Sequence, residues 1–303
     1  MAELQSLILA GGTMQPISEL EQQLSLEGSK DMDSEKKSDG RENQEDLMDR
    51  MLAFSCGHVV PAENILPMVL MNGPSGKALN FSFGMRKNPE MINELSRTLL
   101  NLCNIIPGGV IVFFPSYDYE SYVYNLLEKN GVLTKLEVKK KIFREPKKSS
   151  DVDKVLDSYA SCIKNASSST SKITGAILLS VVGGKMSEGI NFSNDLGRCV
   201  IMVGMPYANI QSAELKEKMA FLDAHSSTPS AGQRYYESLC MKAVNQSIGR
   251  CIRHKGDYAA MILLDNRYGR PQTIAALPSW IQTSTTVQSS FGAAVASIRK
   301  VRN

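Results

Sequence analysis

The 303-residue chain lacks the features that mark several large protein classes. It has no apolar run of about 18 residues, so no segment is expected to span a membrane. Its six cysteines, at positions 56, 103, 162, 199, 240 and 251, include no pair with the short spacing of metal ligands, and its three histidines are not spaced as ligands either. The cysteines are therefore expected to be buried free thiols in a reducing compartment.

No charge of one sign dominates the composition. The chain has 34 Lys and Arg against 31 Asp and Glu, a net charge of +3, which permits a nucleic-acid partner without requiring one. Hydrophobic residues make up 43% and charged residues 21% of the chain, which excludes a wholly disordered or a collagen-like protein. No basic segment precedes the first apolar run, so no signal peptide is expected.

The motifs of nucleotide hydrolysis are also missing from the printed sequence. It has no Gly-Lys-Thr or Gly-Lys-Ser loop and no Asp-Glu-x-His motif for magnesium. Asn72-Gly73-Pro-Ser-Gly76-Lys77-Ala78 looks like a phosphate loop, but its glycines are too close together and Ala78 replaces the hydroxyl that would bind magnesium. We expect a hairpin turn there instead.

The composition divides the chain into three parts. Residues 1–26 hold a short apolar run, a glycine turn and a helical stretch, whereas residues 27–50 are dense in charged residues, Ser and Gly. The second part cannot bury enough apolar surface to offset its ordering entropy and is predicted to be a flexible polar insert. Residues 51–303 have the composition of a packed domain.

Within 51–303, apolar runs of strand length alternate with segments of helical periodicity. Strands are expected at 54–60, 65–72, 79–83, 108–115, 173–182, 200–204 and 259–264, and helices at 89–103, 119–129, 152–165 and 233–252. This alternation predicts an α/β fold with a parallel sheet covered by helices. Ligands of such sheets bind at the carboxyl ends of the strands, where the polar segments 115–117, 183–185 and 265–267 are expected.

The strongest candidate site lies near the end of the longest predicted helix. Gln246, Arg250 and Arg253 are spaced four and three residues apart, so on a helix they would project from one side. Gly249 between them would allow close backbone approach. Guanidinium groups fit phosphate oxygens in bidentate fashion, so this face suits a phosphate chain. The alternative is a surface helix with scattered arginines.

A second candidate follows the predicted strand at 173–182. Gly183-Gly184-Lys185 would expose backbone N–H groups and a positive charge, and Glu188 and Asn191 offer groups that hold hydroxyls. An ordinary strand-to-helix turn is the alternative.

A third candidate is the pair Ser116 and Tyr117, which can contact a sugar–phosphate backbone or stack on a base. The alternative for this pair is a capping serine and a half-buried tyrosine. The basic stretch 135–148 is either an electrostatic track for nucleic acid or, slightly favoured, a solvated face.

Several of these segments, taken in order, resemble a known family. Ser187-Glu-Gly-Ile-Asn-Phe and Gln246-Ser-Ile-Gly-Arg-Cys-Ile-Arg resemble the second motor lobe of superfamily-two DNA helicases, in the iron–sulfur, XPD-like branch. Residues 179–192, 205–206 and 241–246 are similar to the ChlR-type helicases of sister-chromatid cohesion, and Ala10-Gly-Gly-Thr-Met-Gln-Pro resembles the end of their first lobe. The resemblance implies a remnant of the first lobe at 1–26 and a C-terminal RecA-like lobe at 51–303.

The resemblance implies an ATP-dependent DNA helicase, in which ATP with Mg²⁺ is held between two lobes and the second lobe supplies arginines to the transferring phosphoryl group. Arg250 and Arg253 match these arginines, with Arg253 the better candidate for the finger, and Gln246 would orient water or the terminal phosphate. Glu188, Gly189 and Asn191 would line the nucleotide, although many relatives have Asp in place of Asn191.

The same resemblance implies contacts outside the nucleotide. Ser116 and Tyr117 match the motif that grips single-stranded DNA, where Lys185 is expected to contribute, and Thr13 matches the coupling motif between lobes. The implied partners are single-stranded or forked DNA, the first helicase lobe and cohesion factors, in the nucleus.

Three parts of such helicases are missing: the phosphate loop, the Asp-Glu-Ala-His box and the four cysteines of the iron–sulfur cluster. All three would lie upstream of Ala10, so we expect a fragment, a truncated gene model, a shortened isoform or a partial duplicate that is inactive alone. The alternative is a non-catalytic module that holds DNA or a cohesion factor. A free-standing α/β enzyme is disfavoured because no nucleophile or acid–base pair is evident.

Overall fold

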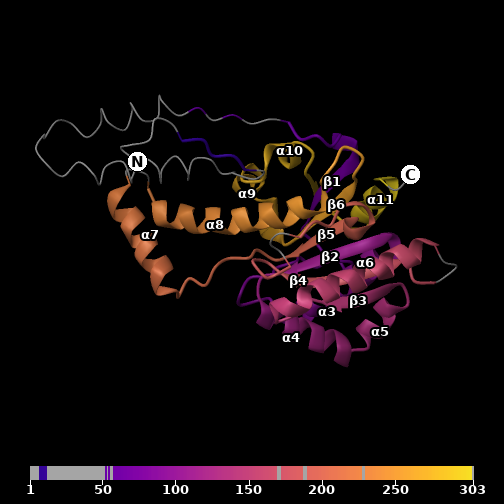
Figure 1. The fold of residues 1–303 in the computed structure, drawn as a ribbon. Helices are drawn as coiled ribbons and strands as arrows, with labels where there is room; N and C mark the ends of the chain where they lie inside the picture. Colours follow the sequence, from indigo (N-terminus) through magenta and orange to yellow (C-terminus); the bar gives the residue numbers. More distant parts are fainter. Residues whose placement is uncertain are drawn as a thin grey trace, which may run out of the picture.

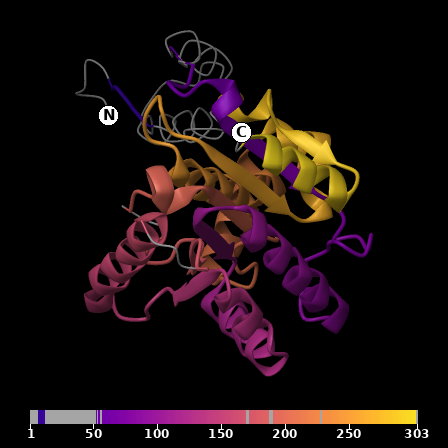
Figure 2. The same ribbon diagram turned by 90° about the vertical axis from the view of Figure 1, so that its right-hand side faces the viewer.

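The computed structural model describes residues 7–11, 52, 54, 57–168, 172–186, 190–226 and 229–301. Its centre is a parallel seven-stranded sheet in the order β3-β4-β2-β5-β6-β1-β7 (Figures 1 and 2). The strands are β1 Ile65–Leu70, β2 Gly108–Phe114, β3 Lys140–Arg144, β4 Gly175–Val181, β5 Cys199–Val203, β6 Ala259–Leu264 and β7 Thr286–Gln288. The helices are α3 Pro89–Ile105, α4 Tyr117–Lys129, α5 Val132–Glu137, α6 Val152–Ser168, α7 Ala213–His225, α8 Ala231–Ile248, α9 Pro271–Ala275, α10 Ser279–Gln282 and α11 Phe291–Val301. The predicted α/β fold is confirmed.

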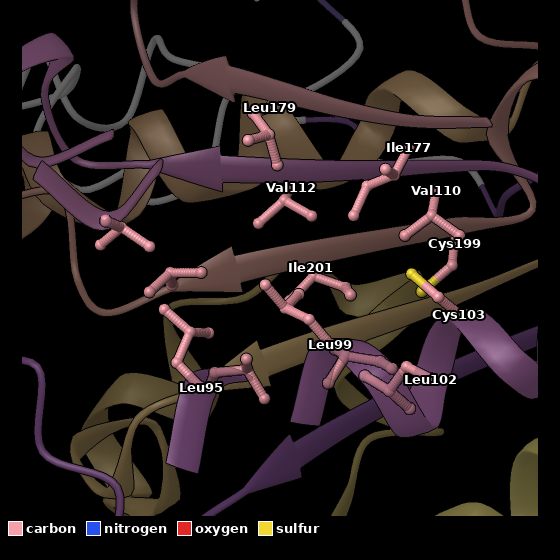
Figure 3. Close-up of a cluster of buried hydrophobic side chains, with 14 of the residues drawn as sticks. Leu95, Leu99, Leu102, Cys103, Val110, Val112, Ile177, Leu179, Cys199 and Ile201 are labelled. Atoms are coloured by element: carbon pink, nitrogen blue, oxygen red, sulfur yellow. The ribbon is translucent and has the colours of Figure 1, made fainter. Parts of the chain in front are cut away.

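Two hydrophobic clusters cover the two faces of the sheet. Strands β2 and β4 are buried along their whole length, and their alternate side chains point to opposite faces. Helices α3, α4, α5 and α11 cover one face, and α6, α8 and α10 cover the other. Figure 3 shows Leu95 and Leu99 of α3 on the first face of the sheet, with Leu99 beside Ile201 of β5. This double cover explains why the central strands read as continuous apolar runs.

The structure of the apolar runs outside the central strands differs from the prediction in several places. The predicted strand at 79–83 does not form, and residues 57–60, the described end of the strand predicted at 54–60, are also irregular. The expected hairpin turn at 72–78 is confirmed, because an antiparallel bridge joins Asn72 to Ala78 and the Gly76 N–H donates to the Gly73 carbonyl at 2.9 Å. The sheet also extends beyond the predicted elements, since β7 pairs with β1.

The basic stretch 135–148 is solvated at Lys135, Lys141, Lys147 and Lys148, as the favoured interpretation expected, but two of its cations are held inside the fold. It contains the end of α5 and the edge strand β3, and the Lys140 side chain is fully buried. The Lys140 ammonium donates to the carbonyl of Gly108 at 2.7 Å. Arg144 forms a bidentate pair with the buried Glu120, both bonds at 2.7 Å. Two of its cations therefore hold the sheet and α4 together and are not available to a nucleic acid.

The described cysteines, at 103, 162, 199, 240 and 251, are free, as expected. Burial raises the pKa of Cys103 to about 12, so this thiol stays protonated at neutral pH. In the described ranges no helix has both the length and the apolar character needed to cross a membrane. The predicted insert at 27–50 and the candidate Thr13 lie outside the described residues.

Candidate nucleotide and nucleic-acid sites

Ser116 and Tyr117 follow β2 at its carboxyl end and begin α4. The Ser116 hydroxyl accepts the Tyr119 N–H at 3.3 Å, so it is the N-cap of the helix. Tyr117 is half-buried and donates its hydroxyl to a carboxylate oxygen of Glu145. Burial, together with this hydrogen bond to Glu145, raises the pKa of Tyr117 to about 12, so the hydroxyl remains a donor at neutral pH. The capping serine and half-buried tyrosine are confirmed, and both still lie at the edge expected of a ligand site.

Glu145 organises this edge of the sheet and was not predicted from the sequence. Its buried carboxylate follows β3 and accepts from the Ser180 hydroxyl at 2.6 Å, the Val181 N–H at 2.9 Å and the Met186 N–H at 3.4 Å, in addition to Tyr117. These donors come from β4, the loop after β4 and the start of α4. One carboxylate therefore fixes three segments relative to one another.

The loop after β4 brings Lys185 to the same edge. The Lys185 N–H donates to the Tyr117 hydroxyl at 3.4 Å, and its exposed ammonium donates to the Lys147 carbonyl. Gly184 is required here because a Cβ atom would collide with the Glu145 carboxylate. Tyr117 and Lys185, which are far apart in sequence, thus lie together as predicted for one binding edge.

The predicted single face of Gln246, Arg250 and Arg253 is not what the structure shows. Helix α8 ends at Ile248 and is followed by a 3-10 turn, η4, at Gly249–Cys251. The backbone becomes extended at the next residue, so Gln246 lies on the helix, Arg250 on the turn and Arg253 beyond both. Gln246 and Arg253 are exposed and Arg250 is half-buried. Apart from its chain neighbours and the backbone of its own helical turn, no atom of the described residues lies within 4 Å of where a Gly249 Cβ would be, so the space above this glycine is open.

Asp257 holds the turn that carries Arg253. This fully buried carboxylate accepts the Arg253 N–H at 3.3 Å, the Asn194 N–H at 3.1 Å and a guanidinium N–H of Arg198 at 3.2 Å. The His254 ring is hydrogen-bonded to the Asn194 side chain at 2.9 Å. The turn is therefore fixed to the segment before β5, while the Arg253 side chain faces solvent. Asp257 was also missed in the sequence, where it stands in a short charged segment.

Asn191 lies beside the arginine-bearing turn. The next residue, Phe192, is buried and donates its N–H to the Arg250 carbonyl at 3.2 Å. Glu188 and Gly189 lie outside the described residues. The described residues on either side of them differ in position: Met186 contacts Glu145, whereas Phe192 contacts Arg250. The segment from 185 to 192 thus begins at one cluster and ends at the other.

The two clusters lie at opposite edges of the sheet. Ser116, Tyr117 and Lys185 follow the carboxyl ends of β2 and β4, but Arg253 precedes the amino end of β6. The expectation that segments 115–117, 183–185 and 265–267 follow the carboxyl ends of strands is confirmed, since β2, β4 and β6 end at Phe114, Val181 and Leu264. The arginines, for which no strand end was predicted, lie at the other end of the strands. Within the described ranges, no group of three or more His, Cys, Asp or Glu is placed to hold a metal ion.

Comparison with known proteins gives consistent matches. The helicase C-terminal domain family matches residues 99–284. The chain is 52% identical to the ATP-dependent DNA helicase DDX11 of Danio rerio, over 99% of its own length and 32% of that protein. It is 40% identical to the ATP-dependent DNA helicase CHL1 of Scheffersomyces stipitis, over 93% of its length and 32% of that protein. It therefore spans about a third of these curated relatives.

A solved structure of an XPD helicase superimposes with a TM-score of 0.53 at 20% identity, over 74% of this chain and 36% of that one. At this identity the match concerns the fold, and it agrees with a RecA-like lobe built on a parallel sheet.

Proposed function

Because this chain belongs to the family of helicase C-terminal domains, in the branch of DDX11 and CHL1, we propose that it is the second motor lobe of an ATP-dependent DNA helicase. In this proposal ATP binds between this lobe and a first lobe, which supplies the phosphate loop and the magnesium ligands. This lobe supplies positive charge to the phosphates at the end of its sheet that carries Arg253, which we call the nucleotide edge. It binds single-stranded DNA at the opposite end, which carries Ser116, Tyr117 and Lys185 and which we call the DNA edge.

The observation that carries the proposal is the link between the two edges. The segment after β4 starts at the Glu145 and Tyr117 cluster and reaches the turn of Arg250 within a few residues. A change of position at the nucleotide edge would therefore move backbone at the DNA edge. Coupling of this kind is what a motor needs, because ATP turnover must alter the grip on DNA. Thr13 is proposed to assist on the side of the first lobe.

At the nucleotide edge, Arg253 is the proposed finger. Its backbone is fixed by the buried Asp257 and its side chain is exposed, so the guanidinium can reach a phosphate on a facing lobe. Arg250 and Gln246 would contact the same phosphates, and Glu188, Gly189 and Asn191 would line the nucleotide. A finger acts on charge that develops in the transition state, so it affects turnover more than nucleotide binding.

At the DNA edge, the proposed contacts are Ser116, Tyr117 and Lys185. The ammonium of Lys185 neutralises a phosphate, and Tyr117, hydrogen-bonded to Glu145 and to the Lys185 N–H, fixes the loop that carries it. We further propose single-stranded or forked DNA in the nucleus as the substrate and cohesion factors as partners. The alternative function is a non-catalytic module, which the missing phosphate loop favours for the 303 residues acting alone.

The proposal is tested by steady-state ATP hydrolysis with single-stranded DNA, on this chain joined to a complete first lobe of a DDX11-type helicase. Arg253→Ala is expected to lower kcat by roughly 10³-fold or more, with a much smaller change in nucleotide affinity. Arg253→Lys should not restore turnover, because an ammonium lacks the planar fork. Arg234→Ala, an exposed arginine on α8, is the matched control and should be unchanged. Near-normal turnover of Arg253→Ala would reject the finger assignment.

A further inference from the structure

The loop at residues 80–88, between β1 and α3, crosses the DNA edge and is anchored at both ends. The Phe81 N–H donates to the buried Asp265 at 2.9 Å, next to the end of β6. At the other end, the Tyr119 hydroxyl of α4 donates to the Arg86 carbonyl at 2.9 Å. The loop therefore has a fixed path from the end of β6 to α4, although it contains no regular strand.

Two phenylalanines of this loop have opposite environments. Phe81 is 3% exposed and packs in the core, whereas Phe83 is 85% exposed. A ring left in water adds almost nothing to folding through burial. The exposure of Phe83 is therefore not explained by the stability of the fold.

A cation holds the Phe83 ring in place. The Arg86 guanidinium carbon lies 4.9 Å from the Phe83 ring centroid and 5.0 Å from that of Tyr119, so the guanidinium contacts both rings. The Nε of Arg86 is buried and has no hydrogen-bond partner in the part of the chain that the structure describes. Arg86 is half-buried overall. Its role at this position is to present a charged and aromatic surface rather than to pair with a carboxylate.

This surface adjoins the residues proposed to bind the DNA backbone. The Tyr119 ring that contacts Arg86 belongs to the residue whose N–H is capped by Ser116. Lys87 adds an exposed ammonium over the ring of Tyr122. The Tyr122 hydroxyl donates to the Lys87 carbonyl at 3.2 Å. An exposed ring in contact with one guanidinium, with a second cation on the ring of Tyr122, suits an anionic polymer that carries flat bases.

We propose that Phe83 and Arg86 form a base-stacking site for single-stranded DNA. One base stacks on the open face of Phe83, and the Arg86 guanidinium contacts the adjoining phosphate. This inference rests on the proposed function, since it requires a strand that passes Ser116. Stacking accepts any base, so the site adds affinity without sequence preference. It also gives the lobe a contact to bases, whereas Ser116, Tyr117 and Lys185 contact only the backbone.

The test compares two labelled probes of about 12 nucleotides, oligo-dT and an abasic strand of equal length, by fluorescence anisotropy on the 303-residue protein. The wild-type protein should bind oligo-dT about 5- to 150-fold more tightly than the abasic strand. Phe83→Ala should remove this difference and leave abasic binding unchanged. Phe83→Trp should keep it, whereas Phe83→Leu, which is apolar but not aromatic, should not. The slope of affinity against salt should not change, because no phosphate contact is lost.

Phe54→Ala is the matched control, since Phe54 is 82% exposed and lies outside this loop, and it should bind both probes like wild type. Equal wild-type binding of the two probes, or a preference for oligo-dT that survives Phe83→Ala, would overturn the stacking site and leave the proposed lobe function intact. Absence of wild-type binding to both probes would overturn both proposals. If Phe83→Ala instead weakens only association with a first lobe, the ring belongs to a protein interface and the stacking site is rejected.

Discussion

Glu145 offers the sharpest test of how the DNA edge is built. Its carboxylate accepts four hydrogen bonds, and two of the donors, the N–H groups of Val181 and Met186, are backbone groups that cannot rotate. In Glu145→Gln one of the two oxygens becomes an NH₂ group. If that group faces Ser180, the hydroxyl can turn to accept, but the Val181 N–H at 2.9 Å loses its acceptor. The amide is therefore expected to face Tyr117 and Met186, where the longer bond of 3.4 Å is lost.

The magnitude follows from this orientation. Hydrogen bonds to a charged group contribute about 1.5–3 kcal/mol and neutral ones about 0.5–1.5 kcal/mol, so the retained bonds each weaken by about 1 kcal/mol. The unsatisfied Met186 N–H adds about 1 kcal/mol or more to the loss of stability. Burying an amide costs less desolvation energy than burying a carboxylate, and this offsets part of the total loss. We expect Glu145→Gln to lower the free energy of unfolding by about 2 kcal/mol and Glu145→Ala by about 4 kcal/mol.

The assay is urea unfolding followed through the fluorescence of Trp280, the one tryptophan of the chain, together with binding of single-stranded DNA under native conditions. Because Tyr117 must turn to accept from the new amide, Glu145→Gln should also weaken DNA binding while the protein is still folded. Glu137→Gln, an exposed glutamate on α5, is the control and should change neither quantity. Unfolding and binding of Glu145→Gln within experimental error of wild type would refute the account of this cluster.

Two further predictions concern charge. Lys185→Ala should reduce the magnitude of the slope of log affinity for single-stranded DNA against log salt by about 0.7, the value for one neutralised phosphate, and an unchanged slope would exclude Lys185 from the backbone contacts. The His58 ring stacks on Trp280 with centroids 4.2 Å apart, and its partial burial there lowers the pKa of His58. The neutral ring therefore stabilises the fold above pH about 6.5, and this contribution is lost as the pH falls through the lowered pKa. A titration of Trp280 fluorescence should give a midpoint below 6.5 that disappears in His58→Gln, and a midpoint above 6.5 would contradict the sign.

The central fold could be predicted because its strands are covered on both faces. Strands such as β2 and β4 then consist of apolar residues alone, and that pattern has few other interpretations. The edge strand β3 was missed because its sequence, Lys140 to Arg144, is mostly basic and only the tertiary structure buries Lys140 against backbone carbonyls. Helix α7 was missed because it has no continuous apolar face: only Leu215 and Leu222 are buried along it.

The candidate sites could be predicted as residue types but not as geometry. The spacing of Gln246, Arg250 and Arg253 suggested one helical face. Such spacing places side chains on one face only where all the residues are helical, and α8 ends at Ile248. Glu145 and Asp257 each stand among other charged residues in sequence, where a solvated side chain is the usual outcome. Both are buried because backbone N–H groups from distant segments converge on them, and such convergence has no local signal.

The central claim, that this chain is a second motor lobe, is tested most directly by ATP hydrolysis with and without single-stranded DNA. The proteins to compare are the 303-residue chain, a complete first lobe of a DDX11-type helicase, and the two joined. We predict background hydrolysis by each lobe alone and DNA-stimulated hydrolysis by the joined protein. DNA-stimulated hydrolysis by the 303-residue chain alone, or no gain when the two lobes are joined, would contradict the claim.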